Sequence, residues 1–182
     1  MFEIEHDRSK RTASATFRIS EKAYHALQNE AERQDTSLNT LVNQVFDSHV
    51  NARIFQEKLD FMRVNRLTFH RILEGTSDQA LMEAGQTSGS ETVRTVTLGR
   101  SGTITMETIL ETISELSEFS DFARYSEIES TGKRVIVLTH ELGPKWSVFI
   151  RSFVNAAFKL VDCDPKATVG DRSVVVEIQS RP

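Results

Sequence analysis

Residues 12–20 read Thr12-Ala13-Ser14-Ala15-Thr16-Phe17-Arg18-Ile19-Ser20, a stretch in which small or apolar side chains alternate with polar ones. Side chains along a strand point alternately to its two faces, so the apolar members share one face and the polar members the other. A lone two-stranded ribbon is marginal in water. Residues 13–19 are therefore predicted to form a strand that depends on a partner strand and on a helical layer beneath it.

Two helix-like segments follow this strand with almost no gap. Ser20 is a candidate N-cap for a helix that carries Ala23, Leu27 and Ala31 at helical spacing. Residues 34–36 form a tight connection, and Ser37 is a second N-cap that opens another amphipathic helix. The apolar positions of this second helix are Leu38, Leu41, Val42, Val45 and Phe46.

The order of strand, helix, short turn and helix over residues 1–50 resembles the ribbon-helix-helix DNA-binding family. In that family each of two chains donates one strand to an antiparallel ribbon, which lies in the DNA major groove. The resemblance implies an intertwined homodimer whose partner is double-stranded DNA. The chain departs from the family pattern in the inter-helix turn, where Asp35 and Thr36 replace the usual glycine and apolar residue.

Carried over position by position, the resemblance makes Ser14, Thr16 and Arg18 the base readers. Arginine is the strongest of these, because it can donate two hydrogen bonds to guanine in the major groove. Other positions would hold the DNA backbone through the edge of the ribbon or the start of the second helix, and these are Thr12, Ser37, Leu38 and Asn39. The alternative is an ordinary edge strand with a solvated Arg18.

Charge is distributed unevenly along the chain. The formal net charge is −4, which is unusual for a DNA-binding protein. Residues 8–18 nevertheless contain Arg8, Lys10, Arg11 and Arg18 and no acidic residue. This basic arm is predicted to contact DNA phosphates through Arg8, Lys10 and Arg11, with a merely solvated N-terminus as the alternative.

Residues 51–90 are predicted to be a helical connector and a linker. An apolar register with alternating spacings of four and three runs from Leu38 to Leu73, which favours either a seam between two chains or a helix packed on its own chain. The stretch Gly85-Gln86-Thr87-Ser88-Gly89-Ser90 is the best linker by composition.

Residues 91–182 are predicted to be a separate α/β sandwich, so that the whole chain belongs to the α+β class. Strands are expected at 92–98, 124–129, 134–139 and 166–178, the last as one or two strands around Gly170-Asp171, and helices at 103–119 and 144–161. This order matches a ferredoxin-like βαββαβ fold. The last helix carries more apolar surface than one side of a small sheet can cover, which predicts a subunit contact and a homodimer or higher homo-oligomer.

The overall layout is similar to that of the nickel-responsive repressors. Those proteins bind nickel through closely spaced histidines and a cysteine, whereas here His140 stands alone on its strand and Cys163 follows the last helix. The sequence therefore predicts neither a metal site nor a cofactor.

Two segments favour a pocket for a small-molecule effector. Residues 99–103 are expected to form a turn before a helix, where amides and Arg100 suit an anion, and residues 140–146 crowd polar and aromatic side chains where a strand gives way to a helix. The candidate residues are Arg100, Ser101, His140, Lys145 and Trp146. For both segments the alternative is a purely structural role.

No catalytic motif occurs, so no catalytic residue is predicted and the chain is not expected to be an enzyme. Its single cysteine excludes an internal disulfide, and no stretch approaches the ~20 apolar residues of a membrane span. The sequence favours a cytoplasmic, prokaryotic, dimeric and sequence-specific transcriptional regulator whose C-terminal domain senses an effector or assembles dimers. The alternatives are an antitoxin-like or plasmid-type DNA binder whose C-terminal half binds a protein, and an enzyme fused to a DNA-binding domain.

Overall fold

The computed structural model describes residues 13–59, 64–120, 122–130 and 133–179, including all their side chains except those of 51–59, 129 and 130. The basic-arm residues Arg8, Lys10 and Arg11, together with Thr12, lie outside this range. The chain divides into two compact units, residues 1–47 and 48–182, and each is described by itself.

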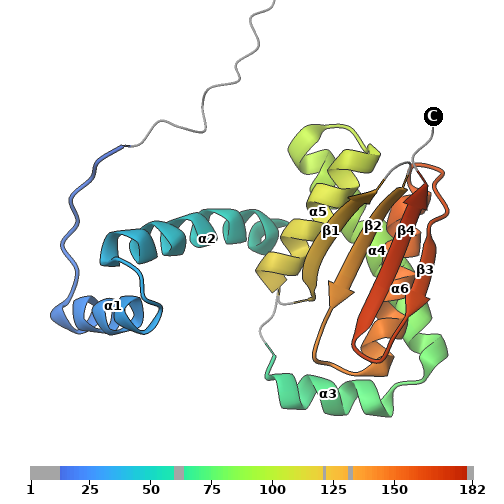
Figure 1. Cartoon of the computed structure of the whole chain (residues 1–182), viewed down its shortest axis with the longest axis horizontal. Coiled ribbons are helices and arrows are strands. Elements are labelled where there is room, and N and C mark those ends of the chain that lie inside the picture. Colours follow the sequence, from blue (N-terminus) through green and yellow to red (C-terminus); the bar gives the residue numbers. More distant parts are fainter. Residues whose placement is uncertain (1–12, 60–63, 121, 131–132, 180–182) are drawn as a thin grey trace, which may run out of the picture. The chain divides into compact units, whose positions relative to one another are not determined.

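The N-terminal unit begins with residues 13–20, which form neither helix nor strand within a single chain (Figure 1). Helix α1 (Glu21–Arg33) then starts as predicted, because the Ser20 hydroxyl accepts a hydrogen bond from the Ala23 amide at 3.2 Å. The turn after α1 places Asp35 in the left-handed region at φ 50°, and the Thr36 amide donates to the Ala31 carbonyl at 2.9 Å. Asp35 thus fills the position where glycine usually closes a helix.

Helix α2 (Leu38–Leu59) also begins where its cap predicts, since the Ser37 hydroxyl accepts from the Thr40 amide at 3.0 Å. It does not continue to Leu73 as one helix. A new helix, α3 (Arg66–Gly75), starts at Asn65, whose side-chain oxygen accepts from the Leu67 amide at 2.9 Å. The apolar register between residues 51 and 63 falls on side chains outside the described range.

Helix α4 (Asp78–Ser101) overturns two predictions. Residues 85–90 are not a linker and residues 92–98 are not a strand, because both lie inside this one helix, which Ser77 caps at its start. Tertiary packing has overridden the strand propensity of threonine and valine and the coil propensity of glycine. Leu81 of α4 is buried in the C-terminal core, so a domain that starts at residue 91 would lose this residue and the first half of α4.

The two glycines of the expected linker have a packing role. A Cβ at Gly85 would lie 2.5 Å from the Phe149 carbonyl oxygen, and one at Gly89 would lie 2.8 Å from the Phe153 Cα. Both partners are backbone atoms of helix α6 (Pro144–Lys159), which cannot move aside as a flexible side chain does. The glycines therefore let the backbones of α4 and α6 touch.

The remaining elements are helix α5 (Met106–Ser120) and four strands, β1 (Arg124–Ser130), β2 (Lys133–Thr139), β3 (Lys166–Val169) and β4 (Ser173–Gln179). These confirm the predicted hairpin before α6 and the paired strands around Gly170-Asp171. The sheet is antiparallel throughout, in the order β1-β2-β4-β3. The ferredoxin-like prediction is wrong, because two hairpins flank α6 and no strand precedes α5 in the described part of the unit.

Helices cover one face of this sheet (Figure 1). Helix α5 packs against β1, α6 packs against β3 and β4, and α4 packs against both helices. The buried residues Ile136, Leu138, Val174 and Val176 alternate along the two central strands and form the sheet side of the core. Because α4 covers α6, the surplus apolar surface of α6 is used inside the chain and no longer argues for a subunit contact.

Candidate functional site

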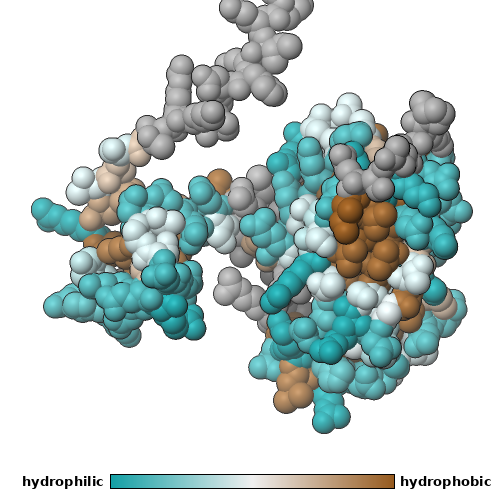
Figure 2. Space-filling view, viewed as in Figure 1, coloured by the Kyte–Doolittle hydropathy of each residue, from teal (hydrophilic) through white to brown (hydrophobic). Residues whose placement is uncertain are grey.

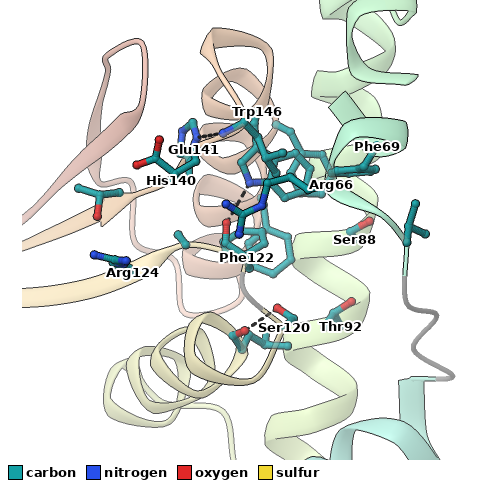
Figure 3. Close-up of a pocket in the computed structure, with 17 residues that line it drawn as sticks. Arg66, Phe69, Ser88, Thr92, Ser120, Phe122, Arg124, His140, Glu141 and Trp146 are labelled. Carbon is teal, nitrogen blue, oxygen red and sulfur yellow. Dashed lines mark hydrogen bonds between the residues drawn. The ribbon is translucent and has the colours of Figure 1, made fainter. Parts of the chain in front are cut away.

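A cavity of about 510 Å³ lies in the C-terminal unit, where β1 begins, β2 ends and α6 starts (Figure 3). Pockets of this volume hold drug-sized ligands. Four helices and the sheet contribute to its wall. The lining residues are Val64, Arg66, Phe69, Ser88, Thr92, Leu116, Ser120, Phe122, Ala123, Arg124, Thr139, His140, Glu141, Leu142, Trp146, Phe149 and Phe153.

Aromatic rings form the apolar wall of the cavity. Trp146 and Phe149 lie about one helical turn apart on the same face of α6. Their rings stack with the centroids 4.4 Å apart and 5° between the planes. Phe69 from α3 and Phe122 from the α5–β1 connection meet the indole edge to face at 5.2 and 5.5 Å. The indole Nε1 donates to the Phe122 carbonyl at 2.9 Å, so the ring is held from three directions. A planar aromatic wall of this kind is complementary to a flat ligand.

His140 closes one side of the cavity, and both of its ring nitrogens are engaged. Nδ1 accepts from the Leu142 amide at 3.3 Å, so the proton lies on Nε2, which is 2.8 Å from the buried Ser147 hydroxyl. Burial lowers the pKa of His140, opposed by the negative charge of Glu141. The ring is therefore a neutral structural wall.

Polar groups reach the cavity from α4 and from the strand ends (Figure 3). Ser88 and Thr92 are half-buried, one helical turn apart, and their hydroxyls form no hydrogen bond with the residues that the structure describes. Arg66 lies beside the rings, and Arg124 stands at the start of β1. The one acidic lining residue, Glu141, forms an ion pair with Arg172 at 3.0 Å.

The structure brings two of the five expected pocket residues together. His140 and Trp146 line the cavity, whereas the Lys145 ammonium donates to the Glu74 carbonyl at 3.1 Å and also to the Thr76 carbonyl. Arg100 pairs with Glu115, and the Ser101 hydroxyl donates to the Thr97 carbonyl at 2.9 Å. These last two residues end α4, where the helix dipole is negative, so the expected anion site before a helix is absent there.

Several lining residues were not predicted from the sequence. Phe69 and Phe122 lie far from Trp146 along the chain, and no local pattern connects them. Ser88 and Thr92 were missed because the first was assigned to a linker and the second to a strand. A helical spacing of Leu81, Gly85, Gly89, Val93 and Val96 was the signal that could have placed them on one helix.

The N-terminal unit leaves most of its predicted core face in solvent. Phe17 is 64% exposed, Ile19 is 53% exposed, and Phe46, which meets Phe17 edge to face at 5.6 Å, is 45% exposed. Among residues 13–50 only Ala31 and Leu41 are buried. Two buried side chains, Ala31 and Leu41, make a very small core for a folded unit.

The predicted base-reading residues of this unit are accessible. Ser14, Thr16 and Arg18 are all exposed. The Ser37 hydroxyl is used in capping, where it also lies 2.7 Å from the Thr40 hydroxyl. The amides of Leu38 and Asn39 belong to the first turn of α2 and have no acceptor inside the helix.

The sheet face opposite the helices carries an apolar patch (Figure 2). Ile128 pairs with Val135, and Val137 pairs with Val175, so these four side chains share the face that the helices do not cover. Ile128 is 58% exposed and the three valines are half-buried. We call these four residues the open-face patch.

Comparison with known proteins finds no matching family model, curated protein or solved structure. No described helix is long and apolar enough to cross a membrane.

Proposed function

We propose that the chain is a dimeric, sequence-specific DNA-binding transcriptional regulator. Residues 13–19 pair with the same residues of a second copy, and the resulting ribbon enters the major groove. The C-terminal unit senses a small molecule and contributes to assembly.

The observation that carries this proposal is the exposed apolar face of the N-terminal unit. Phe17, Ile19 and Phe46 would form the core of an intertwined dimer, and in one chain they lie largely in solvent. Burying one such side chain stabilises a fold by about 1.5–3 kcal/mol. A second copy supplies both the missing partner strand and the missing core.

The local geometry supports the same proposal. The Ser20 and Ser37 caps and the left-handed Asp35 give the compact helix–turn–helix arrangement that a ribbon packs upon. Alternation along residues 13–19 turns Arg18 to the face opposite Phe17 and Ile19 once these residues are extended. Arg18 then points into the groove, and the first-turn amides of α2 meet the DNA backbone.

The open-face patch supports the assembly part of the proposal. In a dimer held by its N-terminal units, two C-terminal units are tethered in one particle, which raises their effective concentration. A small apolar sheet face, insufficient for association of separate chains, can then pair with its copy. Charges of both signs border the patch, including Lys133 and Glu177, whose charged atoms are 3.7 Å apart, and they suit a self-complementary contact.

The proposal is tested by the affinity of the full-length protein for selected and random DNA duplexes at one salt concentration. The specific duplex is first enriched from a random library by the protein itself. Arg18→Ala should lose about 1–3 kcal/mol of discrimination between the two duplexes while remaining dimeric. A change of Arg8, Lys10 and Arg11 to glutamine should instead weaken both duplexes alike and reduce the salt dependence.

Two results would contradict the proposal. The first is a library that yields no enriched sequence, and the second is a selected duplex that binds no better than the random one. An Arg18→Ala protein with unchanged discrimination would remove Arg18 from the base readers. Arg33→Ala is a matched control, because Arg33 is exposed in the same unit but pairs with Glu30 at 2.7 Å in the last turn of α1.

A further inference from the structure

The cavity beside Trp146 exists because small and large side chains face each other across it. Helix α4 presents Ser88 and Thr92, while α6 presents Trp146, Phe149 and Phe153. Gly85 and Gly89 hold the two helices in backbone contact, so the space cannot close by sliding the helices together. The opening is therefore a fixed feature of the packing.

The shape of the cavity selects a flat molecule. Five of its lining residues are aromatic, and the Trp146–Phe149 stack presents a planar surface. A ligand of one or two fused rings fits the volume of about 510 Å³ and gains stacking or edge-to-face contacts with these rings.

The polar lining residues determine which charge and which hydrogen-bonding groups a ligand needs. Arg66 and Arg124 are the cationic lining residues and Glu141 is the acidic one. The Glu141 carboxylate forms an ion pair with Arg172 at 3.0 Å, so the acidic lining residue already has a cationic partner. A guanidinium has five N–H donors and can hold a carboxylate in addition to another partner. The Ser88 and Thr92 hydroxyls, which have no partner among the described residues, complete the polar side.

We infer that this cavity binds a small planar aromatic carboxylate, with the ring against Trp146 and Phe149 and the carboxylate toward Arg66. The inference deepens the sensing part of the proposed function, since such a molecule is the class of effector that would act through this unit. His140 forms part of the wall and undergoes no chemistry.

The test is isothermal titration calorimetry on the full-length protein without DNA, using 2-naphthoate and the uncharged 2-naphthamide as a pair of equal shape. Naphthoate should bind once per chain, and naphthamide should bind about tenfold more weakly, the loss expected for one charge-assisted hydrogen bond. Naphthoate should also change the emission of Trp146, which is the only tryptophan in the chain.

Two pairs of variants locate the site. Arg66→Gln should reduce the affinity for naphthoate to that for naphthamide, whereas Arg71→Gln, on an exposed position of the same helix, should leave it unchanged. Thr92→Val keeps the shape of the side chain but removes its hydroxyl and should weaken binding several-fold. Thr95→Val is its control, because Thr95 is exposed on α4 and does not line the cavity.

Binding of neither probe, equal affinity for both probes, or equal affinity of the Arg66→Gln and Arg71→Gln proteins for naphthoate would overturn the inference. DNA affinity measured on the same preparation separates this inference from the proposed function. A protein that binds naphthoate but no specific DNA would refute the regulator proposal and leave the cavity assignment standing. A protein that binds specific DNA but neither probe would refute the cavity assignment and leave the regulator proposal standing.

Discussion

Replacing Gly89 with alanine tests whether α4 and α6 touch through their backbones. The new methyl group would lie 2.8 Å from the Phe153 Cα, which is 0.6 Å short of the 3.4 Å at which ordinary van der Waals contact begins, and it would lie closer still to the carbonyl oxygen. Alanine gains about 1 kcal/mol over glycine in helix propensity, whereas overpacking of a core typically costs about 1–3 kcal/mol. Because the obstacle is backbone, we expect the upper part of that range and a net loss of about 2 kcal/mol.

The assay is thermal and denaturant unfolding of the full-length protein, with Gly75→Ala as the matched control. Gly75 ends α3 and has nothing within 4 Å of the position its Cβ would take, so alanine there should be neutral or slightly stabilising. A net loss of about 2 kcal/mol corresponds to a fall of roughly 4–8 °C in Tm for a unit of this size. A Gly89→Ala protein as stable as Gly75→Ala would refute the close packing, and with it the assignment of residues 85–98 to one helix.

Three further predictions concern other parts of the chain. Phe46→Ala should weaken the dimer by about 3–6 kcal/mol, because each of the two copies loses one buried side chain. The loss is measured as a higher dissociation constant by analytical ultracentrifugation. On a Cys163→Ser background, Val137→Cys should form an interchain disulfide readily on mild oxidation, and Lys159→Cys, exposed on α6, should not; equal yields would exclude contact at the open-face patch. Unfolding free energy should fall as the pH drops below 6.5, because burial lowers the pKa of folded His140, and His140→Gln should lessen that fall.

The elements that the sequence predicted are those with local signals. Ser20 and Ser37 mark the starts of α1 and α2, and Gly143-Pro144 marks the start of α6. The continuous apolar run Val135-Ile136-Val137-Leu138 marks β2. In each case the deciding interaction lies within a few residues of the signal, so the pattern and the structure agree.

The wrong predictions share a different cause. Residues 85–98 are rich in glycine, serine, threonine and valine, which favour coil or strand when judged locally. They are helical because the backbone of α6, more than 60 residues away along the chain, fits against Gly85 and Gly89. The ferredoxin-like prediction failed with them, since it required a strand at residues 92–98.

Only part of the candidate site could be predicted, because only some of its residues lie close together in the sequence. His140 and Trp146 stand close together in sequence at a strand-to-helix junction, where cavities are common, and both line the cavity. Arg66, Ser88 and Phe122 line the same cavity from three other parts of the chain. No local sequence pattern indicates that these distant residues meet. The N-terminal ribbon stays a prediction, because its pairing partner is a second chain.

The central claim is that the chain recognises a particular DNA sequence, and the most direct measurement is recovery of the genomic DNA that the full-length protein binds. The account predicts enrichment of a few promoter-proximal sites that share an inverted or tandem repeat, with the enrichment lost in Arg18→Ala. DNA recovered in the same proportions as the input, by the wild-type protein and by Arg18→Ala alike, would contradict it.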